Sequence, residues 1–220
     1  MNGARVRLWG LVTLLCFGVG GYGAAVLHYG RSAPKAQSLP PLKGHGTLHL
    51  QVPESPDALV VPPTGSTRPG PVLMVLSEPG LPTTDCESWR AVVGPAGFVL
   101  CADPNLVRAG DAASATRALK GALRALKARW PQHVAPGAVV LAGLGQGARL
   151  ATALSAQEPS FFSRLVLDGH GLSDWTSSYA TIFQRRGGER VLIVCGDEAC
   201  TSSAQRTKLW MQGAALEAKV

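Results

Sequence analysis

The chain has 220 residues, a formal net charge of +7 and 46% apolar residues, enough for one domain with a buried core plus an appendage. The positive charge is spread along the chain, which argues against nucleic-acid binding. Several basic residues fall on one predicted helix, where a solvated face explains them, although that face also suits anionic lipid. They are Arg117, Lys120, Arg124, Lys127 and Arg129.

The N-terminal stretch is apolar. Leu8 to Gly30 is 23 residues without Asp, Glu, Lys or Arg, and it follows Arg5 and Arg7. A helix of about 20 residues spans a bilayer core. We therefore expect residues 1–30 to be a transmembrane helix that anchors an exported domain on the extracytoplasmic side, periplasmic or at the cell surface. Cleavage near Gly23-Ala24-Ala25, as in a signal peptide, would instead give a secreted protein.

A proline-rich segment follows, and residues 31–45 are predicted to be an extended linker to a domain over residues 46–220. In that domain, short apolar runs alternate with amphipathic ones. The expected strands are 46–52, 57–61, 71–76, 98–101, 138–142, 164–168 and 190–195. The expected helices are 85–93, 111–130, 148–157 and 202–217.

This alternation predicts an α/β fold: a three-layer sandwich with a mostly parallel sheet and helices on both faces. The first two strands are separated by a Pro53–Pro56 turn signal and are expected to form an antiparallel edge. In the longest helix, Leu119, Leu123, Leu126 and Trp130 keep a spacing of three or four and should share one buried face. Asp111 or Ser114 is expected to cap that helix, and Pro131 to end it.

Four cysteines lie outside the anchor. An even number in an exported domain suggests two disulfides, and proximity in the chain favours Cys86 with Cys101 and Cys195 with Cys200. The spacing of the second pair is loose for a metal site, and neither a metal nor a cofactor is expected.

Ligands bind such sheets at the carboxyl ends of the strands. One of these ends is a glycine-dense turn, Gly143-Leu-Gly145-Gln146-Gly147, placed between an apolar strand and a helix. Small residues allow such a sharp turn because side chains there would collide with neighbouring elements. Gly145 should adopt a strained conformation with positive φ.

The order of strands, this glycine turn and the late Cys195-Gly-Asp197-Glu198 run resemble the α/β-hydrolase superfamily over residues 46–218. In that family the turn is Gly-x-Ser-x-Gly, and its serine is the nucleophile. Here that position is Gly145. The resemblance places the acid at Asp197 or Glu198, whereas no histidine follows His170, and the chain ends where the last strand is expected to begin.

The loop expected to form the oxyanion hole also departs from the family. It contains Ser77 and Glu78, and a carboxylate opposes a developing oxyanion. Asp168 and His170, at another strand end, are the remaining candidates for acid–base chemistry, although a lone loop histidine is more often a hydrogen-bonded structural residue.

A second interpretation is dinucleotide binding. Gly143-x-Gly145-x-x-Ala148 matches the Rossmann fingerprint, and Asp168 follows the next strand, where it would meet a ribose hydroxyl. However, the fingerprint normally lies in the first strand–helix turn.

The sequence thus predicts an α/β-hydrolase-like exported protein without serine-hydrolase activity. Its role would be to bind a small molecule or a protein, and its N-terminal helix would hold it at the membrane. A residual or truncated esterase is the alternative within the same fold.

Overall fold

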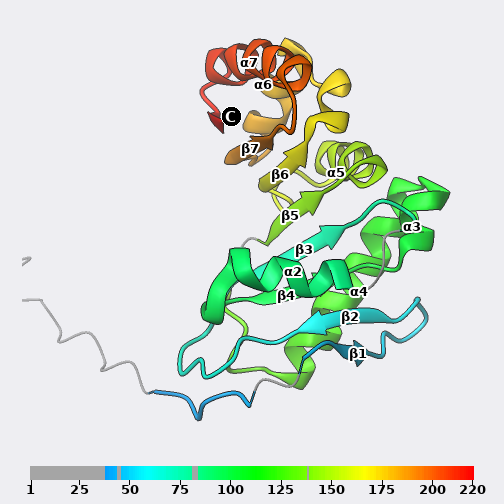
Figure 1. Ribbon diagram of the computed structural model, residues 1–220, viewed down its shortest axis with the longest axis vertical. Helices are drawn as coiled ribbons and strands as arrows, with labels where there is room; N and C mark the ends of the chain where they lie inside the picture. The colour runs from blue at the N-terminus through cyan, green and yellow to red at the C-terminus, as the bar shows by residue number, and fades with distance from the viewer. Residues whose placement is uncertain (1–37, 44–45, 81–83, 138) are drawn as a thin grey trace, which may run out of the picture. The chain divides into compact units, whose positions relative to one another are not determined.

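Eight strands form one sheet in the computed structural model of the chain, in the order β1-β2-β4-β3-β5-β6-β7-β8 (Figure 1). The structure describes residues 38–43, 46–80, 84–137 and 139–220, and Leu39–Val220 is one compact unit. The strands are β1 (Leu48–Leu50), β2 (Ala58–Val61), β3 (Val72–Leu76), β4 (Phe98–Cys101), β5 (Val140–Gly143), β6 (Arg164–Asp168), β7 (Arg190–Val194) and β8 (Glu217–Lys219).

The predicted transmembrane helix, residues 1–30, lies outside the described residues. Among the helices that are described, none combines the length and apolarity needed to cross a bilayer. Part of the predicted linker is described: the Leu39 amide donates to the Thr67 carbonyl over 2.9 Å, and the Pro40 carbonyl lies 2.9 Å from Nε2 of His133.

The topology confirms the predicted sheet. β2 runs antiparallel to both β1 and β4, which gives the expected antiparallel edge. The other neighbours are parallel, from the β3–β4 pair to the β7–β8 pair.

The expectation that the last strand is lacking was wrong. β8 pairs in parallel with β7, with Ala218 opposite Val191. The predicted helix at 202–217 is shifted: α7 spans Glu198–Gly213, and the chain then reverses at Ala215, whose φ is 59°. β8 was missed because its three residues carry two charges and no apolar run, so only its pairing with β7 makes it a strand.

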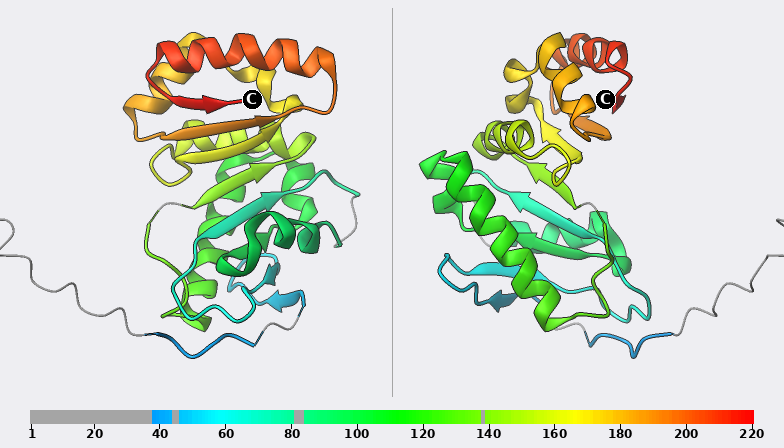
Figure 2. Two further views of the ribbon diagram at one scale, coloured as in Figure 1. Left: turned by 60° about the vertical axis from the view of Figure 1, so that its left-hand side comes forward. Right: turned by 180° about the vertical axis from the view of Figure 1, so that it is seen from behind.

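Helices cover both faces of the sheet (Figure 2). Alternate strand residues face opposite sides. One set, including Leu73, Val75 and Val99, packs with residues of α2 (Thr84–Val93). The opposite set packs with residues of the remaining helices. These are α3 (Pro104–Ala109), α4 (Ala112–Arg129), α5 (Gln146–Gln157), α6 (Ser177–Arg185) and α7. Two 3₁₀ turns complete the described elements: η1 (Gly94–Ala96), which continues α2, and η2 (Gly169–Asp174), which follows β6.

α4 shows why the local prediction succeeded. Its N-cap is Asp111, whose carboxylate accepts from the amides of Ala113 and Ser114. A hydrogen bond from the Ser114 side chain is the largest cause of a lowered pKa of Asp111, and the two amide hydrogen bonds lower that pKa further. The predicted leucine face is buried, and Trp130, next to Pro131, lies 5.6 Å from Phe98 between ring centroids.

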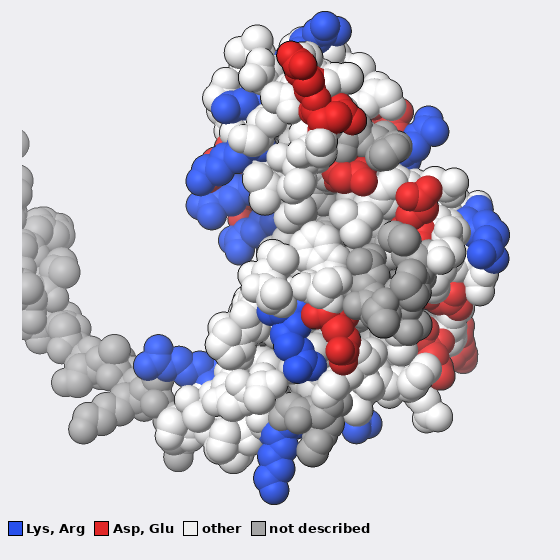
Figure 3. Space-filling view, in the orientation of Figure 1, with Lys and Arg blue, Asp and Glu red and all other residues white. Residues whose placement is uncertain are grey.

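The face that carries α2 is less covered at the other end of the sheet. In β7, Val191 and Ile193 are buried on one side, whereas Leu192 and Val194 are 41% and 50% exposed on the other. On the side seen in Figure 3, a band of uncharged surface lies between the region of α2 and the basic side chains near β7.

Candidate functional site

Five strands, β3 to β7, run parallel, so their carboxyl ends lie at the same edge of the sheet. The loops that follow these strands therefore begin at that edge. This edge is the expected ligand-binding edge. Its loops contain the predicted candidates: Ser77 and Glu78 after β3, Gly143–Gly147 after β5, Asp168 and His170 after β6, and Asp197 and Glu198 after β7.

The turn after β5 is as tight as predicted. β5 ends at Gly143 and α5 begins at Gln146. A Cβ atom on Gly143 would lie 2.5 Å from Cα of Ala148, and one on Gly147 would meet the carbonyl oxygen of Leu76. Both outer glycines are therefore required by backbone packing, which confirms the expectation for them.

Gly145 is the centre of this turn and has φ 56° and ψ −123°. The predicted positive φ is confirmed, and this conformation is strained for any residue that carries a Cβ. The backbone around it is fixed by hydrogen bonds: Leu144 donates to the Leu76 carbonyl over 3.0 Å, and Ala148 donates to the Gly145 carbonyl over 3.1 Å. The centre of the turn therefore has a fixed, strained backbone and no side chain.

Glu78 occupies the space in front of Gly145. A Cβ atom built on Gly145 would contact Oε2 of Glu78 and would lie 2.9 Å from its Cδ. Glu78 is exposed, so its carboxylate can retain water while it covers the turn. The carboxylate of Glu78 consequently lies where the side-chain oxygen of a serine at position 145 would lie.

Asp168 holds the turn from the other side. Its Oδ2 accepts a hydrogen bond of 2.7 Å from the Gly145 amide. The Gly145 amide is one of the donors that a bound pyrophosphate would use at this helix N-terminus. Asp168 already accepts its hydrogen bond. This arrangement gives Asp168 a structural role and weakens the dinucleotide interpretation.

The remaining rim residues lie at the same edge of the sheet. Ser77 is half-buried and Gln146 is exposed. The backbone of His170 is in η2, and its side chain lies outside the described residues. The predicted pairing of Asp168 with His170 in acid–base chemistry therefore stays a prediction.

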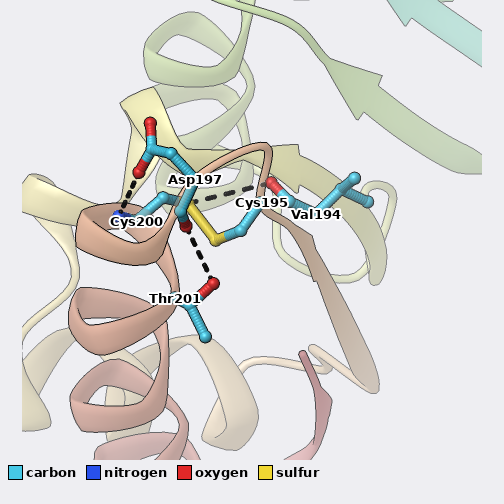
Figure 4. Close-up of a disulfide and its surroundings, with 5 residues drawn as sticks. All are labelled: Val194, Cys195, Asp197, Cys200 and Thr201. Atoms are coloured by element: carbon cyan, nitrogen blue, oxygen red, sulfur yellow. Dashed lines mark hydrogen bonds between the residues drawn. A yellow bond between two sulfur atoms is a disulfide. The ribbon is translucent and has the colours of Figure 1, made fainter.

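The predicted acid, Asp197, is the N-cap of α7 (Figure 4). Its Oδ1 accepts a hydrogen bond of 2.7 Å from the Cys200 amide, and its carbonyl accepts one of 2.9 Å from Oγ1 of Thr201. Glu198 is exposed in the first turn of α7. Asp197 therefore starts a helix, as aspartate commonly does.

Both predicted disulfides are confirmed. Cys195 and Cys200 join the end of β7 to the first turn of α7 (Figure 4), and Cys86 and Cys101 join α2 to β4. Among the described residues there is no group of three His, Cys, Asp or Glu side chains that could hold a metal ion.

Two α-helices near the site, α3 and α6, were not predicted from the sequence. The Thr176 hydroxyl accepts from the Tyr179 amide and caps α6, a local signal that could have found it. Tyr179 then fastens α6 to α5: its hydroxyl donates to the Thr152 carbonyl over 2.7 Å and lies 2.8 Å from Oγ of Ser155. Burial raises the pKa of Tyr179 to about 12.

No protein-family model and no curated protein sequence matches the chain. Solved structures do resemble it. The acylaminoacyl peptidase of Pyrococcus horikoshii superposes with a TM-score of 0.55 at 9% identity, over 82% of this chain and 36% of the peptidase. This chain thus spans about a third of that enzyme's length.

Two smaller enzymes match over most of both chains. Esterase B from Lactobacillus rhamnosis has a TM-score of 0.54 at 11% identity, over 94% of this chain and 82% of the esterase. A dienelactone hydrolase of Klebsiella pneumoniae has a TM-score of 0.54 at 13% identity, over 78% of this chain and 82% of that chain. The strand order, the glycine turn and these superpositions agree: the chain has the α/β-hydrolase fold.

Proposed function

We propose that this chain is a non-catalytic member of the α/β-hydrolase fold class, exported and held at the membrane, that uses the fold to bind a small molecule or a protein. The observation that carries the proposal is Gly145. It occupies the centre of the glycine turn with φ 56° and ψ −123°, yet it offers no atom that could attack a carbonyl carbon.

Electrostatics at the turn supports the same conclusion. Ester and amide hydrolysis passes through an oxyanion, which enzymes stabilise with hydrogen-bond donors. Here the carboxylate of Glu78 lies against the space in front of Gly145. A negative group at this place would raise the energy of an oxyanion formed beside it.

The candidate acids also have structural tasks. Asp168 accepts from the Gly145 amide, and Asp197 accepts from the Cys200 amide. The site thus keeps the scaffold of a hydrolase, while its polar groups stabilise the loops that carry them.

The proposed export rests on the cysteines and the N-terminal stretch. Disulfides persist in oxidising compartments, and the two pairs tie α2 and α7 to the sheet. Leu8 to Gly30 is a charge-free run of 23 residues with Arg5 and Arg7 before it, which is the pattern of an uncleaved anchor with a cytoplasmic N-terminus.

Ester turnover tests the absence of activity. The full chain, purified in mild detergent, would be assayed on short-chain nitrophenyl esters beside the heat-denatured protein and the Gly145→Ala variant. We expect all three to give the same background rate. Wild-type turnover that heat denaturation abolishes would overturn the proposal and favour the residual esterase.

A further inference from the structure

The face of α4 away from the core carries a stripe of basic residues. Arg117, Lys120, Arg124 and Lys127 follow one another at intervals of three and four residues. At 100° per residue, they fall within an arc of about 80° on the helix. These four residues define the basic stripe. Helix α4 lies on the side of the molecule turned to the viewer in the right-hand view of Figure 2.

Most of this charge is not neutralised within the domain. Lys120 pairs with Glu158 over 2.8 Å. Arg117, Arg124 and Lys127 are exposed, and none of them forms an ion pair with an acidic residue in the described part of the chain. Three cations thus lie along one helix without an ion pair among the described residues. The charge of Asp111 partly balances Arg117, and the like charges repel one another.

A groove runs beside the stripe. It has a volume of about 470 Å³ and is bounded by α4 and the turn at Pro53–Pro56. Arg117, Lys120 and Arg124 contribute to its wall, together with a single acidic residue, Glu54. Gly121 and Ala118 line it with little bulk, so a compact anionic group can approach the guanidinium groups of the two arginines.

The chain enters the domain near the end of the same helix. The Pro40 carbonyl contacts His133, which follows the last turn of α4, and residues 38–43 pass this end of the helix in Figure 2. The charge-free run from Leu8 to Gly30 lies shortly before this point in the sequence. The first described residues of the domain therefore lie beside the C-terminal end of α4.

We propose that the basic stripe of α4 docks on the phosphate-bearing headgroups of anionic lipids. This inference rests on the proposed membrane attachment for the identity of the anion. Basic residues near an anionic bilayer contribute about fivefold each to affinity. The stripe would orient the domain, with α4 toward the membrane and the opposite face, which carries α2, toward solvent.

Photocrosslinking in reconstituted full-length protein tests this orientation. A benzoylphenylalanine in place of the exposed Ala128 would be next to the stripe, and one in place of Val92, which is 72% exposed on α2, would be on the opposite face. Each protein would be placed in neutral phosphatidylcholine vesicles or in vesicles that also contain phosphatidylglycerol. We expect lipid adducts at 128, at least fivefold more with phosphatidylglycerol, and no such increase at 92.

Two charge-matched variants serve as controls. Arg117→Gln/Arg124→Gln/Lys127→Gln removes three charges from the stripe, and Arg185→Gln/Arg206→Gln/Lys208→Gln removes three from α6 and α7. We expect the first to abolish the enhancement at 128 and the second to preserve it. Equal adducts at 128 in both lipids, or equal loss in both variants, would overturn the proposal.

Two further readouts separate the possible failures. Flotation with neutral vesicles reports on the N-terminal anchor alone, so failure there with lipid adducts at 128 would refute the anchor and leave the stripe. A labelled DNA duplex tests the other anion. If the duplex binds tightly, loses binding in the stripe variant only and displaces the lipid adducts, the lipid assignment is overturned in favour of nucleic acid.

Discussion

The carboxylate of Glu78 and the α-carbon of Gly145 face each other across the glycine turn, so that a Cβ atom on Gly145 would lie 2.9 Å from Cδ of Glu78. The two residues come from loops after neighbouring strands, β3 and β5. The centre of the turn, where enzymes with the α/β-hydrolase fold carry their nucleophile, is thus without a side chain in this chain and is covered by an acidic side chain.

This contact predicts coupling between the two positions. Gly145→Ala should lower the free energy of unfolding by about 1–3 kcal/mol because of the positive φ. The Glu78→Ala variant should relieve part of that cost, since the alanine leaves space for the new methyl group. Urea denaturation of the two single variants and the double variant measures the coupling. If the change in unfolding free energy of the double variant equals the sum of the two single changes within about 0.5 kcal/mol, the contact is absent.

Gly147, the last glycine of the turn, is expected to tolerate a side chain less well than Gly145. In Gly147→Ala the methyl group would meet the backbone carbonyl of Leu76, which cannot rotate away. The loss of stability should therefore exceed that of Gly145→Ala. Gly213→Ala is the matched control, because no heavy atom lies within 4 Å of the new methyl and φ is not positive. Its unfolding free energy should be unchanged or slightly raised.

Asp168 is predicted to support the turn through its acceptor. Asp168→Ala leaves the Gly145 amide without its carboxylate partner and should cost about 1–3 kcal/mol. Asp168→Asn retains an oxygen acceptor and should cost less. Chemical denaturation of both variants checks this order, and equal stabilities would show that the hydrogen bond contributes nothing.

Tyr179 gives a prediction for pH. Its folded pKa is raised to about 12 from the ordinary value of 10.0, mainly by burial. The folded state therefore favours the protonated phenol. The contribution of Tyr179 to the free energy of unfolding is fully present below pH 10 and is lost as the pH rises toward 12. Difference absorbance between wild type and Tyr179→Phe should isolate a phenol that titrates well above pH 10. Titration at pH 10 would mean that the hydroxyl is not buried against Thr152.

The disulfides should differ in their contribution to stability. Replacing Cys86 and Cys101 with alanine opens a 15-residue loop and should cost about 3 kcal/mol, whereas Cys195 and Cys200 close a five-residue loop worth about 2 kcal/mol. Urea midpoints of the two double variants compare them. Peptide mapping without reductant should recover both pairs from protein made in the native host, and four free thiols would argue against export.

Much of the fold could be predicted because its signals are local. The apolar runs of the central strands, the Asp111 cap and the leucine face of α4 each depend on residues close in sequence. The glycines of the turn were also readable, since their spacing alone implies close packing. α3 was missed because six residues give no helical period, and β8 because it is a strand only beside β7.

The arrangement at the site depended on tertiary contacts. Nothing in the sequence indicates that Glu78 reaches Gly145 or that Asp168 bonds to the amide of the turn, because these pairs meet only when β3, β5 and β6 are aligned. Asp197 was interpreted as an acid by resemblance. Its position immediately before a helix is also a cue for capping, and the structure shows that Asp197 caps α7; its role as an acid stays a prediction.

Labelling with a serine-directed fluorophosphonate tests the central claim most directly. The full chain would be treated with the probe, beside Gly145→Ser and a serine esterase as a positive control, and the modified residue would be located by mass spectrometry. Because position 145 has no hydroxyl, the wild-type chain should remain unlabelled while the esterase is fully modified. Stoichiometric labelling of any serine in the wild-type chain would contradict the assignment of this fold to a non-catalytic role.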